Sequence, residues 1–426
     1  MGLSAQFRVL LMVAAVLLAA SFTVFARLRP RSALLLWLLV VAFIPIWVEV
    51  RLKIPVSAVS GVGVLLLASL LWRRPRPYGM ADLLAAFLFV VASAPLLVGQ
   101  LGLSSFVGVT TVWMVGFGLG RFAPQAMSPT WIYGAVAVVF AVVGALAVLE
   151  FVTGWHGLAS WGPSNSVSAT WRPIQERGGL ARSEGAFGHS IALGSSLAMA
   201  VALAVASPFR PIVRIALIAV MLAGVATTLS RAAVVSAVLG LLLSIMFLRG
   251  DSVHRVRKGL SALLLVAAAV FAPYFLRVLA ESGEAEGSAA YRGSLLTLLP
   301  AIRVFGRSSA LQISPTGQTY FGSFRSIDSQ LVLFGLTYGA MTLALVLTLL
   351  MLAVARVLRC RARPATIAVV AQLPCLLTVA LITQYHIFFW FIAGLAVAAE
   401  ISNRPVSTGD AHFSTNTVNS FERHLV

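Results

Sequence analysis

Long apolar runs separated by short polar segments dominate the chain. A helix needs roughly 20 apolar residues to cross about 30 Å of hydrocarbon, and thirteen runs reach or approach that length. The pattern predicts transmembrane helices at about 8–27, 33–50, 56–72, 81–98, 101–119, 131–151, 188–206, 210–229, 232–248, 259–279, 331–355, 365–383 and 386–401. No small-residue cleavage site follows the first run, so we expect a retained helix there and not a secretory signal. The predicted class is an all-α polytopic membrane protein with about 12–13 transmembrane helices.

Lysine and arginine are distributed unevenly between the connecting segments. The odd-numbered segments hold 17 of them, among which Arg121 is expected to be a loop cation, and the short even-numbered segments hold three. Short cytoplasmic loops of membrane proteins carry the excess of Lys and Arg. We therefore expect the odd segments and the C-terminus to be cytoplasmic and the even segments to face outward. The side of the N-terminus stays open, because Arg8 lies in the first run and the count is twelve or thirteen helices.

Two outward-facing segments are longer than simple connections require. They contain Trp, Gly, Pro, Ser and most of the remaining acids, and loops of such length are commonly functional. The chain thus divides into N-terminal transmembrane helices at 1–151, a first long external loop at 152–187, central helices at 188–279, a large external loop at 280–330, C-terminal helices at 331–401 and a disordered cytoplasmic tail at 402–426. Within the large loop, 295–305 is apolar enough to predict a short helix along the membrane surface.

Composition supports the membrane interpretation and limits the partners. Hydrophobic residues make up 60% of the 426 residues and charged residues only 10%, whereas soluble domains carry about 25% charge. A net charge of +18 would suggest a nucleic-acid-binding protein, but 17 of the 31 cationic residues lie in expected cytoplasmic loops, where they set topology. We expect membrane lipids as partners and no nucleic acid.

The sequence gives no indication of a cofactor or a metal. Two cysteines form neither a disulfide framework nor a cysteine-based metal site. No glycine-rich phosphate loop, Asp-x-Asp pair or His/Asp cluster with metal-ligand spacing occurs. If the protein is an enzyme, a lipid-borne substrate on the outer face fits better than a cytosolic nucleotide sugar with Mg²⁺.

Three outward-facing segments carry residue types suited to chemistry. The first places Arg182, Glu184 and His189 just before an expected helix. A helix N-terminus there would favour an anionic ligand, and two nearby glycines permit positive φ. An ordinary polar loop is the alternative interpretation.

The second and third segments each hold one prominent ionisable residue. Arg231 follows Ser230 between two expected helices, and a snorkelling interfacial arginine is the alternative. Asp328 precedes the eleventh expected helix, where a helix-capping Asp or Ser explains it equally well. Arg292 and other arginines of the large loop are either solvated or converge on phosphate. The chain has 29 Arg and two Lys, so the choice of arginine over lysine carries little information.

Two other ionisable residues are interpreted without a role in chemistry. Glu150 lies at an expected outer helix end, where solvation accounts for it. His386 lies in a tight outer turn, where an amphipathic interfacial residue is the favoured interpretation.

The order and spacing of the three segments resemble the O-antigen ligase and O-antigen polymerase-like family of multi-pass membrane proteins. The resemblance covers about 180–345 and rests on an Arg-x-x-Gly-x-Phe segment, a Ser-Arg pair entering a helix, an arginine opening a large external loop, and a His-Asn or Asp-Asn element after that loop. The matching residues are Arg182, Gly185, Phe187, His189 and Gly194; Ser230 and Arg231; Tyr291, Arg292, Phe305 and Gly306; and Asp328, Ser329 and Gly339.

The resemblance implies a GT-C-like helical bundle and a metal-independent glycosyl transfer at the outer face of a bacterial cell membrane. Such proteins move a glycan from a polyprenyl-pyrophosphate-linked oligosaccharide to a hydroxyl of an acceptor glycan or lipid. The setting would be surface or exopolysaccharide assembly, with other polysaccharide-assembly proteins as further partners. The pyrophosphate ligands implied by the resemblance are Arg182, Arg231 and Arg292.

The resemblance also bears on the catalytic base. Asp328 stands where the ligase branch has histidine, which favours a polymerase over a ligase. A carboxylate can still act as general base for an acceptor hydroxyl, and Glu184 and His189 are the fallback bases.

Two other functions remain open at the level of sequence. A multi-pass transporter or channel for a small solute would need its coupling site near the bilayer midplane, where no acid or cation is expected. A peptidoglycan glycosyltransferase of the shape-and-division type also uses lipid-linked sugars, but no segment clearly resembles one. A cavity opening to one leaflet would favour transfer, and a polar path through both leaflets would favour transport.

Overall fold

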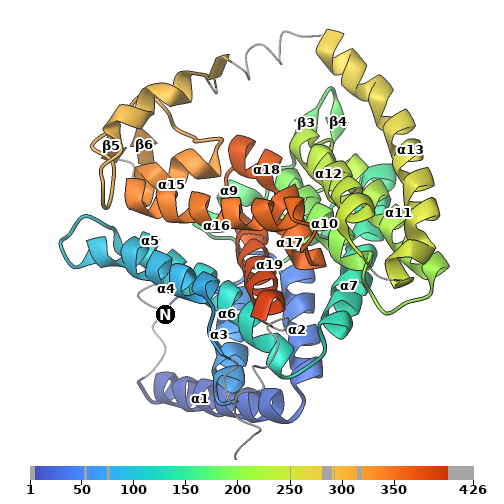
Figure 1. The fold of residues 1–426 in the computed structure, drawn as a ribbon. Helices are drawn as coiled ribbons and strands as arrows, with labels where there is room; N and C mark the ends of the chain where they lie inside the picture. The colour runs from blue at the N-terminus through green and yellow to red at the C-terminus, as the bar shows by residue number, and fades with distance from the viewer. Residues whose placement is uncertain are drawn as a thin grey trace, which may run out of the picture.

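The computed structural model describes residues 5–51, 55–73, 77–249, 251–280, 290–291, 293–313 and 319–401. It is about 74% helical, and the strands of the described residues form three two-stranded antiparallel hairpins (Figure 1). The expected all-α class is confirmed. Arg292 and the expected tail 402–426 lie outside the described residues.

The first part of the chain forms helices joined by short connections. Its elements are α1 (Ala5–Leu28), α2 (Pro30–Phe43), β1 (Glu49–Arg51), β2 (Pro55–Ser57), α3 (Ala58–Leu71), α4 (Met80–Ser93), η1 (Ala94–Leu96), α5 (Leu103–Gly108), the π-helical η2 (Val109–Met114), α6 (Val115–Phe122), η3 (Ala123–Gln125) and α7 (Pro129–Thr153). Figure 1 shows α1 lying across the lower ends of α2 and α3.

The rest of the chain contains the core helices and both expected long loops. Its elements are α8 (Gly157–Ser160), α9 (Ser166–Trp171), β3 (Glu176–Arg177), β4 (Leu180–Ala181), η4 (Gly185–Phe187), α10 (Ser190–Ala204), α11 (Pro211–Thr227), α12 (Arg231–Phe247), α13 (Asp251–Ala280), η5 (Leu296–Ala301), β5 (Leu311–Ile313), β6 (Thr319–Phe321), α15 (Gln330–Tyr338), α16 (Ala340–Leu358), α17 (Pro364–Ala371), α18 (Leu373–Thr378) and α19 (Thr383–Ile401). The expected surface helix at 295–305 appears as the shorter η5.

Every expected apolar run contains a helix, but several runs are broken. The run at 331–355 divides at Gly339, whose φ is +98° and whose position would bring an added Cβ within 2.6 Å of the Val304 carbonyl oxygen. Only glycine tolerates that combination of positive φ and close approach. The run at 365–383 divides near Pro374, because proline lacks the N–H that continues a helix.

Two other expectations need correction. The run at 33–50 was expected to be one helix, but α2 ends at Phe43 and the β1–β2 hairpin follows. Arg121 was expected to be a loop cation, yet it is buried in α6 and donates from Nε to Asp82 Oδ1 over 2.6 Å. A buried guanidinium requires such a partner, because burial removes its hydration.

Three helical segments of the described residues are long and apolar enough to cross a membrane. These are Leu103–Gln125, Pro129–Thr153 and Ala340–Leu358. Shorter apolar helices accompany them. The expected set of twelve to thirteen transmembrane helices therefore stays a prediction, while three candidate spans indicate membrane association.

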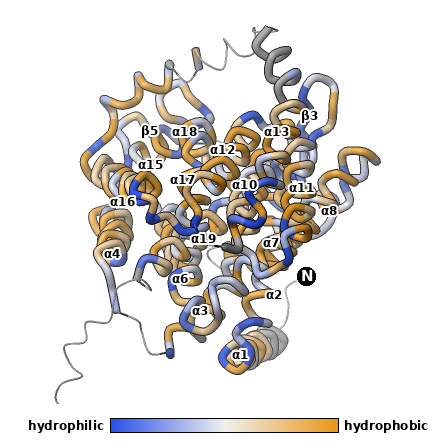
Figure 2. The backbone as a smooth tube through the Cα atoms, turned by 45° about the vertical axis from the view of Figure 1, so that its right-hand side comes forward, coloured by the Kyte–Doolittle hydropathy of each residue, from blue (hydrophilic) through white to orange (hydrophobic). Residues whose placement is uncertain are grey.

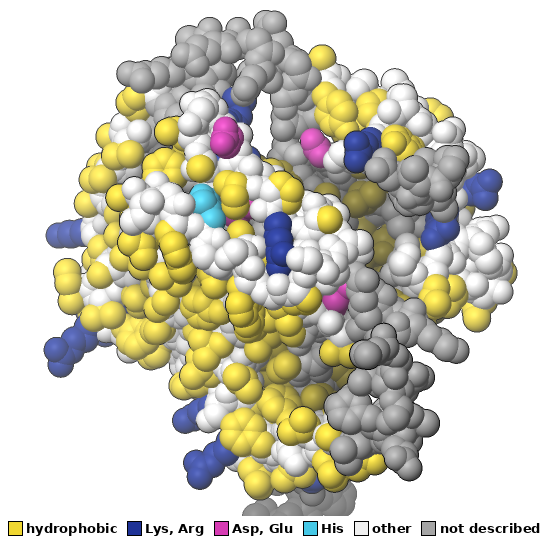
Figure 3. Space-filling model, turned by 180° about the vertical axis from the view of Figure 1, so that it is seen from behind, with side chains coloured by type: hydrophobic (Ala, Val, Ile, Leu, Met, Phe, Trp, Pro, Cys, Tyr) yellow, Lys and Arg dark blue, Asp and Glu magenta, His cyan; other side chains and the backbone are white. Residues whose placement is uncertain are grey.

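The surface of the described residues is strongly apolar. Figure 2 shows hydrophobic residues along most helices and hydrophilic residues mainly at their ends. Figure 3 shows a broad hydrophobic area over one face, with arginine and lysine side chains projecting at its edges. Large apolar side chains are exposed on several helices, for example Phe87 of α4, Val142 of α7 and Met351 of α16.

Helix α10 forms the centre of the bundle. Nearly all of its residues are buried, and it packs against α7, α11, α12, α17 and α19. Its Ala, Ser and Gly residues let neighbouring backbones approach closely, as is typical of helix packing in membranes. Because α10 begins directly after His189, the rigid core fixes the position of the loop that was expected to carry chemistry.

Candidate functional site

A cavity of about 560 Å³ lies where four distant parts of the chain meet. Its walls come from the loop between α9 and α10, the turn between α11 and α12, the segment before α15, and residues 378–382 between α18 and α19. The charged and titratable residues that line it are Arg177, Arg182, His189, Arg231 and Asp328. Three sequence segments that were expected to carry chemistry therefore share one cavity.

The β3–β4 hairpin places the first two arginines. Gly178 and Gly179 form its two-residue turn with φ of +57° and +75°, the conformation that glycine adopts readily in tight hairpins. Arg177 Nη1 donates to the Leu229 carbonyl over 2.9 Å, and Arg182 Nε donates to the Thr228 carbonyl over 2.8 Å. Both guanidinium groups are thus tied to the turn between α11 and α12.

That turn is itself in an uncommon conformation. Leu229 has a φ of +50°, which a branched side chain rarely adopts and which costs of order 1–3 kcal/mol. Ser230 then caps α12 by accepting from the Ala233 N–H over 3.4 Å, and Arg231 is the first residue of the helix. The cavity therefore receives an arginine together with the positive end of a helix dipole, and both favour an anion.

His189 is held as a neutral ring. Its Nδ1 accepts from the Ile191 N–H over 3.2 Å, so the neutral imidazole carries its proton on Nε2. Burial lowers the pKa of His189 to about 4, with Arg182 as a second cause. The ring packs edge-on against Trp171, with 5.8 Å between the centroids. This geometry suits a hydrogen-bond donor to an anion better than a base.

Asp328 lines the cavity from the segment before α15 and is exposed. Ser329 caps α15 by accepting from the Val332 N–H over 3.4 Å, so the helix cap that could have explained Asp328 is supplied by its neighbour. The Asp328 Oδ1 accepts from Ser326 Oγ over 3.0 Å. Gln330, which follows Ser329, contacts the 378–382 wall. Its backbone N–H donates to the Val379 carbonyl, and its Oε1 accepts from the Leu381 N–H.

A second cavity of about 470 Å³ adjoins the first. Asp328 and Ser326 line both cavities, and the second one also includes Tyr291 and Phe324, whose rings lie edge to face with centroids 5.7 Å apart. The Tyr291 hydroxyl donates to the Ser326 carbonyl. Burial and the Asp328 carboxylate raise the pKa of Tyr291. Asp328 therefore lines both an arginine-rich cavity and a second one that combines two aromatic rings with Arg325.

Glu184 does not line either cavity. Its side chain is 0% exposed, and its Oε1 accepts from the Gln175 N–H over 2.9 Å. Burial raises the pKa of Glu184 to about 7, with the nearby Glu150 carboxylate as a further cause. The structure thus places this fallback base behind the loop and not within reach of the cavity.

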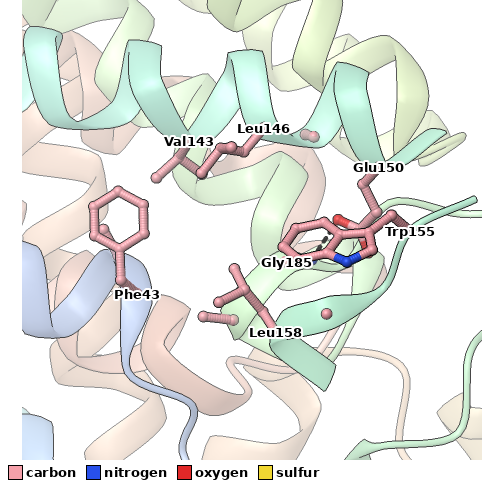
Figure 4. Close-up of a pocket in the computed structure, with 11 residues that line it drawn as sticks. Phe43, Val143, Leu146, Glu150, Trp155, Leu158 and Gly185 are labelled. Carbon is pink, nitrogen blue, oxygen red and sulfur yellow. Dashed lines mark hydrogen bonds between the residues drawn. The ribbon is translucent and has the colours of Figure 1, made fainter. Parts of the chain in front are cut away.

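Glu150 has a role that the sequence did not indicate. It was expected to be a solvated acid at a helix end, but it is only 6% exposed. Its Oε2 accepts from the Gly185 N–H over 2.9 Å, and its Oε1 accepts from the Glu184 N–H and lies 2.6 Å from His156 Nδ1. Figure 4 shows Glu150 of α7 reaching the backbone at Gly185, beside Trp155. Glu150 therefore holds the loop that carries Arg182.

The outcome for the predicted site residues is mixed. Arg182, Arg231, His189 and Asp328 come together in the first cavity. Glu184 lies outside it, and Arg292 lies outside the described residues. Sequence reasoning counted Arg177 only among the arginines of the long external loops and gave it no specific role, although the Gly-Gly turn of a hairpin was an available signal. It also misplaced His386, which lies half-buried in the first turn of α19 with its ring centroid 6.1 Å from that of Trp113.

Among the described residues, no group of three or more His, Cys, Asp or Glu side chains is close enough to hold a metal ion. No protein-family model, curated protein or solved structure matches the chain. The site must therefore be interpreted from its own geometry.

Proposed function

We propose that the protein is a membrane glycosyltransferase that takes a glycan from a polyprenyl-pyrophosphate donor and transfers it to an acceptor hydroxyl. The observation that carries this proposal is the meeting of Arg177, Arg182, Arg231 and Asp328 in the lining of one cavity. Arginine suits pyrophosphate because its planar fork binds two oxygens at once. The Asp328 carboxylate in the same lining suits the removal of a proton from a hydroxyl group.

The proposed transfer has one bond formed and one bond broken. The acceptor oxygen attacks the anomeric carbon of the donor sugar, and the bond from that carbon to the pyrophosphate oxygen breaks. Asp328 takes the hydroxyl proton, and the polyprenyl pyrophosphate leaves with the bonding electron pair. Arg182 and Arg231 stabilise the charge that builds on the leaving group, as preorganised donors do in other transfers. The Nε2–H of His189 supplies a further donor.

The two adjoining cavities support separate places for donor and acceptor. The arginine-rich cavity fits the pyrophosphate, and the cavity with Tyr291 and Phe324 offers aromatic faces on which a sugar can pack. Asp328 lines both, which is where a base must lie to act on an acceptor hydroxyl. A glycan acceptor in the second cavity favours a polymerase over a ligase that acts on a lipid.

The proposed location is a bacterial cell membrane, with the cavity facing outward. This orientation follows from the excess of Lys and Arg in the odd-numbered connecting segments, which are expected to be cytoplasmic. A transporter would need a polar path between the two ends of the bundle. The central helix α10 is instead buried and mainly apolar along its length, which supports transfer over transport.

The proposal is tested with Arg231→Ala and the matched control Arg303→Ala. Arg303 is an exposed arginine of the same expected external face and does not line the first cavity. We expect Arg231→Ala to lower glycan transfer by about 10²–10³-fold, which is the usual effect of removing one preorganised donor. Chain length of the surface glycan in cells and binding of undecaprenyl pyrophosphate by the purified protein are the two measurements.

Both variants must reach the membrane in equal amounts for the comparison to count. Arg303→Ala should keep full transfer. Full activity of Arg231→Ala would contradict the pyrophosphate-ligand role, and an unchanged surface glycan after deletion of the whole protein would contradict glycan transfer itself.

A further inference from the structure

A basic chamber of about 940 Å³ lies at the other end of α12 from the proposed active site. Helix α12 begins in the first cavity at Arg231 and ends at Phe247, which lines the chamber. Its 17 residues span about 26 Å. The chamber and the cavity are therefore separate sites on opposite ends of the bundle.

The chamber is built to attract an anion. Its lining includes Arg249, Arg356, Arg361 and Arg363 against one acid, Glu400. Glu400 is already engaged, because its Oε1 lies 2.6 Å from Arg356 Nε. The net charge of the lining is therefore strongly positive, as is typical of sites for phosphate-bearing ligands.

Two helices also begin at the chamber. Helix α7 starts at Pro129 and α17 starts at Pro364, and both prolines line it. Helix N-termini carry partial positive charge and favour anions. Ser128 already caps α7 by accepting from the Trp131 N–H. The N-cap of α17, Arg363, makes no side-chain cap hydrogen bond, since an arginine side chain has no oxygen that could accept one.

An apolar groove of about 170 Å³ joins this chamber. Arg356, Thr366 and Glu400 line both. From there the groove follows one face of α16 as far as Val346, a distance of about 15 Å along the helix. Its other walls come from α4, α6, α17 and α19, and most of its lining is aliphatic or aromatic. A charged chamber that opens into a long apolar groove matches an amphipathic ligand.

The groove also contains a buried donor without an acceptor. Trp390 lines the groove and is only 4% exposed, and its indole Nε1–H makes no hydrogen bond within the protein. Buried N–H groups are nearly always paired. Trp390 lies ten residues before Glu400 on α19, about 15 Å along the helix from the chamber, so this donor lies at the deep end of the groove.

We propose that this chamber and groove bind an anionic phospholipid, with its phosphate among Arg249, Arg361 and Arg363 and one acyl chain along α16. The proposal rests on the membrane location of the proposed function but not on its glycan chemistry. By the same topology the lipid belongs to the cytoplasmic leaflet, which is the leaflet opposite the proposed active site.

The test uses the purified full-length protein in nanodiscs that contain phosphatidylglycerol and phosphatidylcholine in equal amounts. Native mass spectrometry after release into detergent measures which lipid stays bound. We expect the wild-type protein to retain phosphatidylglycerol. The double variant Arg361→Gln/Arg363→Gln should retain at least five-fold less of this lipid. Arg359→Gln is the matched control, because Arg359 is an exposed arginine of the same turn that does not line the chamber.

The acyl chain is tested separately with Ala353→Phe, which fills the groove from α16. Ala355→Phe, on the same helix but outside the groove lining, is its control. We expect only Ala353→Phe to reduce lipid retention. A third measurement compares thermal unfolding midpoints with added phosphatidylglycerol and with added inorganic phosphate. Only the lipid should raise the midpoint.

Three results would overturn the proposal. Equal loss of lipid in Arg359→Gln would show attraction to surface charge in general. Full retention in both Ala353→Phe and the double arginine variant would show that the lipid binds elsewhere. Stabilisation by inorganic phosphate as large as that by the lipid would show a site for a free anion. Transfer activity is a separate readout, so failure of the glycan proposal would leave these results interpretable.

Discussion

The two ends of α12 use the same residue type in different surroundings. Near its first residue, two of the cavity arginines, Arg177 and Arg182, donate to carbonyls of a strained turn, and a histidine and an aspartate line the same cavity. At its other end, Arg361 and Arg363 lie on an exposed turn, and the one acid nearby is already paired with Arg356. Fixed guanidinium groups beside a carboxylate suit a reaction, whereas arginines beside an apolar groove suit retention of a ligand.

The difference shows that a count of arginines does not locate a site. Both ends look equally basic in the sequence, and the whole chain prefers Arg over Lys. What distinguishes the cavity is the pair of backbone carbonyls that hold Arg177 and Arg182 and the presence of a carboxylate able to accept a proton. Preorganisation of this kind is the main source of transition-state stabilisation in many enzymes.

The strongest test of this contrast is Asp328→Asn. The amide cannot take the acceptor proton, so we expect turnover to fall by about 10²–10⁴-fold while binding of undecaprenyl pyrophosphate changes less than twofold. Transfer rate and donor affinity are measured on the same purified preparation. Arg361→Gln at the other end of α12 should leave the transfer rate within twofold of the wild type.

Ser329→Ala is the matched control for Asp328→Asn. Ser329 caps α15, so its loss should cost about 1 kcal/mol of stability without a comparable loss of turnover. Equal losses of donor binding and turnover in Asp328→Asn would instead mark the aspartate as a structural residue.

A third arginine environment sharpens the comparison. Arg121 and Asp82 form a buried pair in which the arginine is 2% exposed and the aspartate 8%. Arg121→Leu should lower the free energy of unfolding by about 3–5 kcal/mol, because it leaves a carboxylate buried without its partner. Denaturant unfolding in detergent measures the change.

The double variant Asp82→Leu/Arg121→Leu separates charge from packing. It should recover most of the stability, since no isolated charge remains. A double variant as unstable as the single one would show that packing of the arginine side chain, and not its charge, holds α4 and α6 together.

The smallest expected effect concerns pH and the loop that carries Arg182. The folded-state pKa of Glu184 is raised to about 7 and that of His189 is lowered to about 4. Protonated Glu184 favours the folded state, so its contribution is full below about pH 4.5 and is lost as pH rises to about 7. His189 acts in the opposite sense, because its contribution grows as pH rises from about 4 to 6.5.

Single variants separate the two contributions. His189→Asn should become less stable from pH 4.5 to 7, by up to about 3 kcal/mol at 1.4 kcal/mol per pKa unit, and Glu184→Gln should become more stable as pH rises to 6.5. Thermal unfolding midpoints across this range are the measurement. If the unfolding midpoints of both variants changed with pH in the same way, Glu184 would not be held protonated and His189 would not be held neutral in the folded protein.

The hydrophobic runs predicted where most helices lie, but they did not predict where a run divides into two helices. Gly339 lies in a run that is apolar on both sides, so nothing in the periodicity separates α15 from α16; the break depends on the close approach of the Val304 carbonyl. The residues of the cavity were found because Arg182 and Asp328 come shortly before helices and Arg231 begins one, and side chains at such positions gather at one end of a bundle. Glu150 was missed because its partners are backbone N–H groups, which leave no mark in a sequence.

The contact between Glu150 and Gly185 also bears on how the protein is made. These residues are 35 positions apart, so the loop can be secured soon after α10 leaves the ribosome. The wall formed by 378–382 comes almost two hundred residues later. During synthesis the nascent chain would therefore hold its arginines in place for some time before any cavity exists around them, and a chain that stops before α18 would carry a finished loop without a site.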